Sequence, residues 1–355
     1  MSIDVSRDRV LAHRVAAHGF DRASADPAVL ELGVQDTPYG SARQAMAARG
    51  AAEAGTALVW SVRGAPHLHR RGELPRLAAA LWPLSDADAT ARITNPLIKE
   101  GAKLGLEAFR RTAAAFRRVL TRPMGKGEAS RAVSALVPES LTYFCQSCDA
   151  VHVSGGLFQH AGLSGGVEVR PEGRGTVLAP LSDPVPPPET AAGTAEYVRT
   201  FLRLLGPATP AEAARFLGTT ATALKPAWPD GLAEVRVGGK RAWFPEDSVD
   251  ALLSAAPPSG LLRLLPPGDP YLQTRDRPML VPEKEREKQV WRTLGSPGAV
   301  LLDGGLAGVW RTRLRAKRLD LTVTAFEPLP ERLLTGEAER LAALRGAGEV
   351  RLIRE

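Results

Sequence analysis

Two adjacent residues near the amino end of the chain, Gln35 and Asp36, place an amide and a carboxylate on one short segment. We expect this segment to be a turn between two helices, close to Tyr39. A carboxylate or amide held at such a turn can orient a water molecule for attack on a sugar carbon. No lysine is near in sequence to form a Schiff base, so a lyase mechanism has no candidate nucleophile here. Gln35 and Asp36 are therefore the candidate catalytic residues.

Asp36 also has a purely structural interpretation. An expected helix begins at Ser41, and an aspartate shortly before a helix can accept hydrogen bonds from the amides of its first turn. The spacing by itself favours this capping role. Both roles remain open from the sequence.

A row of cations, Arg311, Arg313, Arg315 and Lys317, alternates along one expected strand. Alternate residues of a strand share one face, which would space these charges about 6.5–7 Å apart. That spacing matches the repeat of phosphates along one nucleic-acid strand. The competing interpretation is an edge strand whose charges discourage aggregation.

Two more arginines, Arg275 and Arg277, lie on an expected loop. Their guanidinium groups could contact phosphates. The competing interpretation is a set of surface salt bridges with Asp276 or Asp269.

A possible metal-binding pattern begins at Cys145 and Cys148 and continues to His152 and His160. It partly matches a zinc knuckle, but there is no second Cys-x-x-Cys, and the two histidines are far apart. We expect residues 138–148 to be an apolar helix in which the thiols are buried. The sequence therefore predicts no metal, and it contains no nucleotide-binding fingerprint that would predict a cofactor.

The elements that would position these residues are clearest at residues 206–248. The pattern predicts a helix after Thr209, a break at Gly218, a second helix and then a hairpin turning at residues 238–239. This order is that of a winged helix-turn-helix, with Lys240 and Arg241 at the hairpin tip as candidate DNA contacts. The competing interpretation is a packing module that touches no nucleic acid.

Length and charge set the wider limits. The chain has 355 residues, a net charge of +7 and a pI near 9.7, which is a mild preference for polyanions. Two cysteines in such a chain indicate a reducing compartment, and no stretch is apolar enough to predict a membrane span. We expect a cytoplasmic, nucleoid-associated monomer.

The overall pattern predicts an α+β fold of tandem winged helix-turn-helix modules with a carboxy-terminal antiparallel β-hairpin or meander region. The expected division is an amino-terminal module at residues 1–100 carrying the catalytic loop, a second at 101–182 and a third at 189–256. Residues 257–355 form a β-rich region with the basic strand.

Four segments, in order along the chain, resemble the AlkZ/YcaQ-like DNA glycosylases. They are residues 32–38 together with Arg49, residues 62–68, residues 269–277 and residues 302–311. No single segment is specific, but the ordered set covers most of the chain.

The resemblance implies tandem winged helices that cradle duplex DNA, and monofunctional removal of alkylated or crosslinked purines by water attack at C1′ of the deoxyribose. The family's catalytic pair, Gln-apolar-Gln or Gln-apolar-Asp, falls on residues 34–36 when the sequences are aligned on Pro38, with Val34 at the first Gln position, so that only Asp36 matches. Asp36 is then the water-orienting residue. If the register shifts by one, Gln35 takes the first place and Thr37 the last.

The resemblance further implies that the DNA contacts include Arg63 and His67, in addition to the loop and strand arginines. The partner is then double-stranded DNA, possibly alkylated. A non-catalytic winged-helix protein, acting as a regulator or a damage-binding factor, is the alternative.

Overall fold

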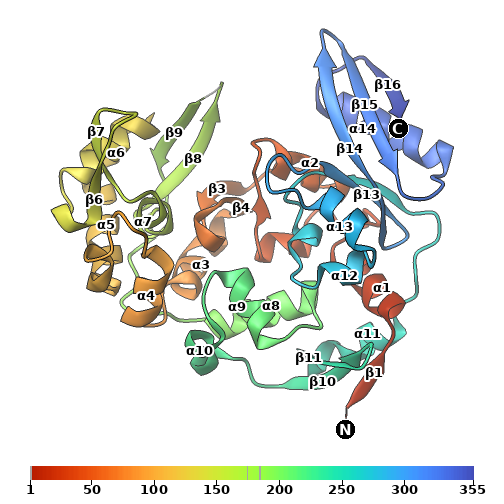
Figure 1. Cartoon of the computed structure of the whole chain (residues 1–355), viewed down its shortest axis with the longest axis horizontal. Coiled ribbons are helices and arrows are strands. Elements are labelled where there is room, and N and C mark those ends of the chain that lie inside the picture. Colours follow the sequence, from red (N-terminus) through yellow and green to blue (C-terminus); the bar gives the residue numbers. More distant parts are fainter. Residues whose placement is uncertain (1, 174, 184) are drawn as a thin grey trace. The chain divides into compact units, whose positions relative to one another are not determined.

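The computed structural model describes residues 2–173, 175–183 and 185–355. The chain forms two compact units, each assembled from stretches that are separated in sequence (Figure 1). The first unit comprises Met1–Ala54, Thr200–Thr209 and Asp230–Glu355, and the second comprises Gly55–Arg199 and Pro210–Pro229. The predicted 189–256 module contributes residues to both units, and the division into four modules stays a prediction.

The first unit contains a helical amino end and a β-rich carboxy-terminal half. Its helices are α1 (Arg7–Ala17), α2 (Ser41–Ala48), α11 (Val249–Ser254), α12 (Arg277–Leu280), α13 (Lys284–Val290) and α14 (Glu331–Leu344). Its strands are β1 (Ile3–Val5), β2 (Val34–Gln35), β10 (Leu232–Val237), β11 (Lys240–Pro245), β12 (Leu262–Leu265), β13 (Gly298–Leu302), β14 (Gly305–Arg315), β15 (Arg318–Ala325) and β16 (Glu349–Arg354). Helix α8 (Thr194–Leu205) has residues in both units.

A five-stranded sheet in the order β12-β13-β14-β15-β16 forms the centre of the first unit. Its strands are antiparallel except for the parallel β15–β16 pair. Successive residues face opposite sides, so Val300 packs with α14 while Ala299 and Leu301 pack with α1 and the 271–290 segment. Burial on both faces makes this sheet the rigid base of the unit. The predicted carboxy-terminal β region is confirmed.

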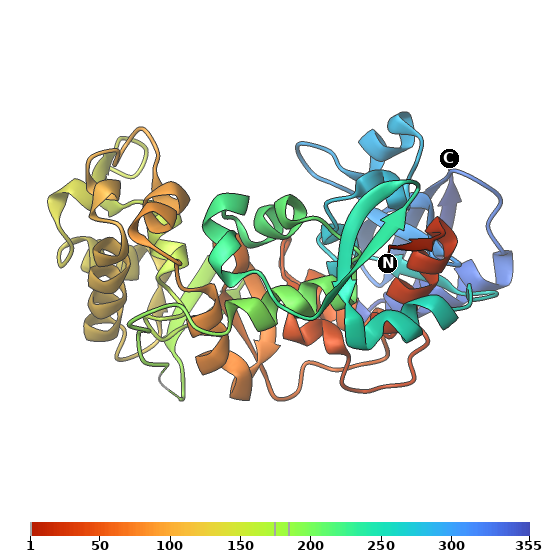
Figure 2. The same ribbon diagram turned by 90° about the horizontal axis from the view of Figure 1, so that it is seen from below.

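The amino terminus adds a strand that the sequence did not reveal. Strand β1 pairs in parallel with β10, next to the β10–β11 hairpin, and the two lie side by side in both views (Figures 1 and 2). The hairpin itself was predicted: Gly238 and Gly239 both have positive φ, as its tight turn requires. Helix α1 begins at Arg7 after the cap Ser6.

The second unit, in its described residues, is a set of short helices with four small strand pairings: β3–β4, β5–β9, β8–β9 and β6–β7. Its helices are α3 (Leu74–Leu81), α4 (Asp86–Ile93), α5 (Leu106–Val119), α6 (Lys126–Ser134), α7 (Gly155–His160), α9 (Pro210–Leu217) and α10 (Ala221–Leu224). Its strands are β3 (Thr56–Trp60), β4 (Pro66–Arg70), β5 (Met124–Gly125), β6 (Thr142–Cys145), β7 (Ala150–Val153), β8 (Val167–Glu172) and β9 (Gly175–Pro180).

Aromatic side chains form the core of this second unit. Phe116 of α5 lies 4.5 Å, between ring centroids, from Phe158 of α7, which in turn contacts Trp60 of β3. Strand β9 pairs with both β5 and β8, giving the order β5-β9-β8. The hairpin β6–β7 is inserted between α6 and α7.

Helices α9 and α10 follow the predicted boundaries. Helix α9 begins with Pro210, Gly218 follows its last residue with φ +76°, and the Thr220 hydroxyl accepts the amide of Ala223 at the start of α10. A proline at the first turn and a positive-φ glycine after the last are the signals that predicted this pair.

One predicted helix is wrong. Residues 138–148 form one 3₁₀ turn (Glu139–Leu141) and then strand β6, so the two cysteines lie on a hairpin and not in a helix. The β-branched and aromatic residues of β6 favour extended backbone.

The fold is therefore mixed α+β, as predicted. Among the described residues, no helix is long and apolar enough to cross a bilayer.

A buried ion pair joins α2 to the 266–277 segment of the first unit. Both oxygens of Asp269 accept hydrogen bonds from Arg49, each at 2.8 Å, and both side chains have no exposed surface. Arg49 also contacts Nδ1 of His18 at 3.1 Å and lies over the ring of Phe20. The Asp269 carboxylate accepts the amide of Tyr271 as well. This pair fixes the segment that carries Arg275 and Arg277.

His67, in β4 of the second unit, is 3% exposed. Its Nδ1 lies 2.9 Å from the carbonyl oxygen of Ala65. Burial, with the neighbouring His69 next, lowers the pKa of His67 to about 3. The imidazole is therefore neutral in the folded protein at any pH well above that value.

We expect Asp269→Asn to lower the free energy of unfolding by about 3–5 kcal/mol, because it leaves the charge of Arg49 buried without a counter-ion. Adding Arg49→Met should regain part of the loss, since the buried charge is then removed. Glu285→Gln, which breaks an exposed pair with Lys288, is the control and should cost about 1 kcal/mol or less. Urea unfolding followed by tryptophan fluorescence measures all three. An Asp269→Asn loss no larger than the control's would contradict the role of the pair.

Acid should destabilise the protein through His67. Its pKa is about 6.5 in the unfolded chain, so its contribution is complete above that pH and is lost as the pH falls toward 3. Between those values one proton is taken up on unfolding, a slope of about 1.4 kcal/mol per pH unit. Urea unfolding at several pH values should show a shallower slope for His67→Gln than for the unmodified protein. Parallel curves would show that His67 does not contribute.

Candidate active site and nucleic-acid interface

A cavity of about 600 Å³ lies within the first unit and collects residues predicted to do chemistry. Its walls come from the segment after β2, from the 267–277 loop, from the end of α13 and from β14. The residues that line it include Gln35, Thr37, Gly268, Arg275, Arg277, Trp291 and Arg311. The structure thus brings the predicted catalytic loop together with three of the predicted phosphate-binding arginines.

Gln35 and Asp36 lie on opposite sides of an extended segment. Gln35 and Thr37 line the cavity, as alternate residues of a strand should, whereas Asp36 is turned away and is 6% exposed. The cavity-facing pair is therefore the one obtained when the sequence register is shifted by one. The sequence offered Thr37 as one of two registers and could have favoured it only if residues 34–35 had been predicted as a strand.

The Asp36 carboxylate caps α2. Its Oδ1 accepts the amide of Ala42 at 2.9 Å, and the amides of Gly40 and Ser41 also interact with it. Burial raises the pKa of Asp36, although the three amides act in the opposite direction. The structural interpretation of Asp36 is thus observed, and its catalytic role stays a prediction.

A second carboxylate, Glu53, is electrostatically coupled to Asp36. Burial raises the pKa of Glu53 first, the charge of Asp36 raises it further, and Arg43 lowers it. Two neighbouring carboxyl groups cannot both ionise as easily as one alone. Nothing in the sequence pattern pointed to Glu53, because the pairing arises only from the fold.

The loop at 266–277 approaches the 35–37 segment closely at Gly268. Its φ is +80°, and a Cβ added there would lie 3.1 Å from the carbonyl oxygen of Thr37 and 3.7 Å from the Gln35 amide. Both the backbone conformation and the close approach favour glycine. The Gln35 amide is therefore held against this loop.

One of the two loop arginines, Arg277, is held by stacking on an aromatic ring. Arg277 begins α12, and its guanidinium lies 5.0 Å from the ring centroid of Trp291. Asp276, which was a predicted partner of these arginines, instead forms a 2.7 Å ion pair with the buried Arg14. The stacking of Arg277 presents a cation beside the cavity with little freedom to move.

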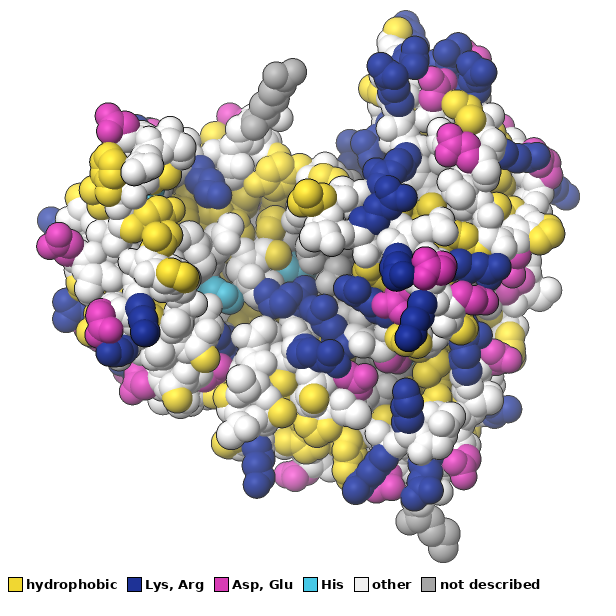
Figure 3. Space-filling view, in the orientation of Figure 1, with side chains coloured by type: hydrophobic (Ala, Val, Ile, Leu, Met, Phe, Trp, Pro, Cys, Tyr) yellow, Lys and Arg dark blue, Asp and Glu magenta, His cyan; other side chains and the backbone are white. Residues whose placement is uncertain are grey.

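The basic row on β14 is partly as predicted. Arg311, Arg313 and Arg315 alternate on the strand, opposite Thr322, Asp320 and Arg318 of β15. The prediction that Lys317 belongs to the same strand is wrong. The strand ends at Arg315, and Lys317 lies in the two-residue turn after β14. Lys and Arg side chains gather over this end of the β14–β15 hairpin (Figure 3).

Contacts distinguish the members of the row. Arg311 donates to the carbonyl oxygen of Gly295 at 2.7 Å, and Arg315 forms a 3.1 Å ion pair with Asp320. All three arginines of the row are exposed. Arg311 and Arg313 are therefore the better placed for phosphates, since the charge of Arg315 is partly neutralised.

The hairpin tip at β10–β11 carries Lys240 and Arg241, both exposed. Arg241 pairs with Glu234 across the hairpin at 2.6 Å and lies over Trp243. The predicted position is confirmed, and DNA contact there stays a prediction.

In the second unit, Arg63 is half-buried and His67 is buried. Arg63 has φ +56°, donates to the carbonyl oxygen of Phe216 and lies over the Phe216 ring. His67 is buried as described above. Their predicted DNA contacts stay predictions, and the contacts seen here hold β4 and α9 within their unit.

Comparisons with known proteins agree with the resemblance in the sequence. The model of the family described as DNA glycosylase AlkZ-like matches residues 38–349. Among solved structures, Streptomyces sahachiroi DNA glycosylase AlkZ superposes with a TM-score of 0.72 and 22% identity, covering 99% of this chain and 100% of that one. No curated protein matches the sequence. The structural likeness confirms the fold, and the family match shows that the chain belongs to the AlkZ-like DNA glycosylases.

Proposed function

We propose that this DNA glycosylase excises alkylated or crosslinked purines from duplex DNA, by directing water to C1′ of the deoxyribose at the Gln35–Thr37 cavity. The observation that carries the proposal is the composition of that cavity: a water-orienting amide, a hydroxyl and three arginines border one space of about 600 Å³. Its volume is in the range of sites that bind small organic groups, about 300–1,000 Å³.

The chemistry requires little from the protein. A purine alkylated on a ring nitrogen carries positive charge, so its bond to deoxyribose is weak and the base leaves as a neutral molecule. The protein must place a water and stabilise an oxocarbenium-like sugar. The amide oxygen of Gln35 can accept a hydrogen bond from that water, and the Thr37 hydroxyl can hold its other side.

Asp36, which does not line the cavity, is proposed to act on the sugar through the negative charge of its carboxylate. A carboxylate adjacent to the site stabilises positive charge that develops on the sugar. Its raised pKa limits this contribution to the pH range in which the carboxyl is ionised. The absence of a lysine near Gln35 in sequence supports a monofunctional mechanism, without a covalent lyase step.

We further propose that the DNA-binding parts are winged-helix modules, as the resemblance implies. Support comes from the order α5, β5, α6, α7, β8 and β9 with sheet order β5-β9-β8, and from the glycine-turned β10–β11 hairpin with its basic tip. The proposed state is a monomer associated with the nucleoid, with duplex DNA as the partner.

Base release tests the catalytic proposal. On methylated duplex DNA, Gln35→Ala should slow release of 7-methylguanine by about 10²–10³-fold, the usual effect of losing one preorganised polar group. Asp36→Asn should lose release as well, because asparagine can still cap α2 but carries no charge. Tyr39→Phe, an exposed position on the same loop, is the control and should keep full activity.

The outcomes separate the alternatives. Release by Asp36→Asn equal to that of the unmodified protein would reduce Asp36 to a helix cap. Tight duplex binding with no abasic product from any alkylated or crosslinked duplex would favour the non-catalytic DNA-binding protein instead. Thermal melting of each variant shows whether a loss reflects unfolding.

Binding to DNA should depend on the β14 row. Arg311→Glu with Arg313→Glu should weaken duplex affinity, and the slope of log K against log salt should fall by about 0.9 for each phosphate that the variant no longer binds. Arg332→Glu, at an exposed position on α14, is the control, because it makes the same change of charge as each of the two substitutions in the row. Fluorescence anisotropy with a labelled duplex at several salt concentrations measures both. Equal losses of affinity per charge in the row and control variants would mean that only net charge matters.

A further inference from the structure

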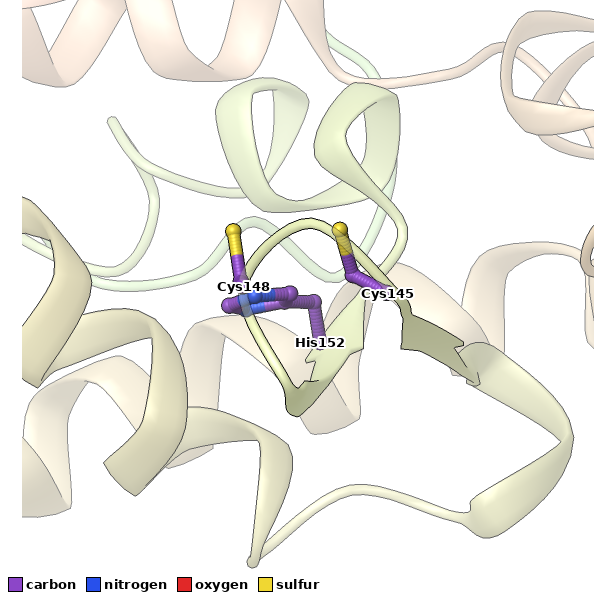
Figure 4. A group of neighbouring side chains, drawn as sticks. All are labelled: Cys145, Cys148 and His152. Carbon is purple, nitrogen blue, oxygen red and sulfur yellow. The ribbon is translucent and has the colours of Figure 1, made fainter.

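The hairpin β6–β7 brings together three side chains that nothing in the glycosylase proposal uses. The potential ligand atoms of Cys145, Cys148 and His152 all lie within 4.8 Å of one another. Figure 4 shows both sulfur atoms on the same side of the turn, with the His152 ring beside Cys148. We propose that the chain binds a zinc ion here, in a Cys-x₂-Cys-x₃-His site. This revises the expectation of no metal, which depended on a helix that the structure does not contain.

The strand geometry explains how the three residues meet. Cys145 pairs with Ala150 and Tyr143 pairs with His152, so Cys145 and His152 are diagonal neighbours on one face of the hairpin. The turn between the strands returns at Asp149, whose φ is +47°. Cys148, in that turn, is thereby placed beside the other two.

The thiolate is the form of cysteine that binds metal. The hydroxyl of Ser147 lies 3.2 Å from the sulfur of Cys145 and 3.9 Å from that of Cys148. A hydroxyl in this position can donate a hydrogen bond to a metal-bound sulfur.

The orientation of His152 is that of a metal ligand. Its Nδ1 lies 3.1 Å from the hydroxyl of Ser130 on α6. Its Nε2 is buried and has no hydrogen-bond partner among the described residues. A zinc-bound histidine almost always uses one ring nitrogen for the metal and the other for a hydrogen bond that fixes the ring. A zinc ion would satisfy the Nε2 atom and link the hairpin to α6.

The distances between the three potential ligand atoms are close to those of a tetrahedral zinc site. Zn–S bonds of about 2.3 Å and Zn–N bonds of about 2.0–2.1 Å set tetrahedral ligand atoms about 3.5–3.8 Å apart. Side-chain adjustments of about 1 Å therefore complete the site. Two thiolates and an imidazole favour zinc over calcium or magnesium, which prefer oxygen.

The fourth coordination position is open to a cavity of about 310 Å³ that the three ligands help to line. A water, or a group entering that cavity, would complete the tetrahedron. His160, the other histidine of the sequence pattern, lies at the end of α7 near Phe109 and is not part of the group. The site stands independently of the glycosylase proposal, because it shares no residue with the Gln35 cavity.

Metal content of the untagged full-length protein, prepared without chelator, tests the inference. Mass spectrometry of the metal should find one zinc per chain, removable by a strong chelator and restored by added zinc. Cobalt exchanged into the site should give a thiolate-to-cobalt charge-transfer band together with the visible bands of tetrahedral cobalt. A protein without zinc that also shows no such bands with cobalt would overturn the proposal.

Variants locate the site. Cys145→Ser, Cys148→Ser and His152→Asn should each lose the metal, while Val151→Thr, exposed on the same hairpin, should keep it. Ser130→Ala should weaken zinc affinity by about 10–100-fold, as removal of a histidine's second partner typically does. Because the cobalt spectrum uses the unmodified chain, it tests the ligands even if a variant does not fold.

Thiol titration separates zinc from a disulfide. The denatured protein, prepared without reductant and treated with chelator, should release two free thiols. No free thiols, or full zinc content in both cysteine variants, would contradict the assignment.

Discussion

The geometry of the candidate site depends on the buried ion pair between Arg49 and Asp269. Charges without exposed surface are costly to desolvate, and the cost is offset only when geometry and additional hydrogen bonds are good. Here both carboxylate oxygens are paired, and His18 and the amide of Tyr271 take up further bonding capacity. Arg49 follows α2, which is capped by the residue next to Gln35, and Asp269 opens the loop that carries Arg275. One interaction therefore sets both walls of the cavity.

Strand alternation places neighbouring residues of the 35–37 segment in different surroundings. Because β2 is extended, Gln35 and Thr37 share the cavity side, and Asp36 faces the amino end of α2. A carboxylate used as a cap is oriented by three amides, so its charge is fixed in place and does not need to reorganise during a reaction. This placement buries the carboxyl group, and burial raises the pKa of Asp36. A residue can thus be a helix cap and an electrostatic contributor together, and only loss of the charge with retention of the cap distinguishes the two.

The sequence could predict elements whose signals are local. The β10–β11 hairpin follows from Gly238 and Gly239, and the α9 boundaries follow from Pro210 and Gly218. Long-range features had no local signal: the parallel β1–β10 pair, the bond between Arg49 and Asp269, and the approach of Glu53 to Asp36 arise from packing. Because the apolar content of residues 138–148 favoured a buried helix, the sequence did not predict that Cys145, Cys148 and His152 lie together.

Net charge is a poor guide to the DNA interface of this protein, because many of its cations are used inside the fold. Arg14 and Arg49 are buried against Asp276 and Asp269, and Arg92 is buried against Asp88. These pairs contribute nothing at long range, since each guanidinium is neutralised by its own carboxylate. The potential that DNA would meet comes instead from exposed, weakly compensated side chains such as Arg313 and Lys240. Changing the hairpins that carry these side chains should therefore alter binding more than an equal change of charge elsewhere.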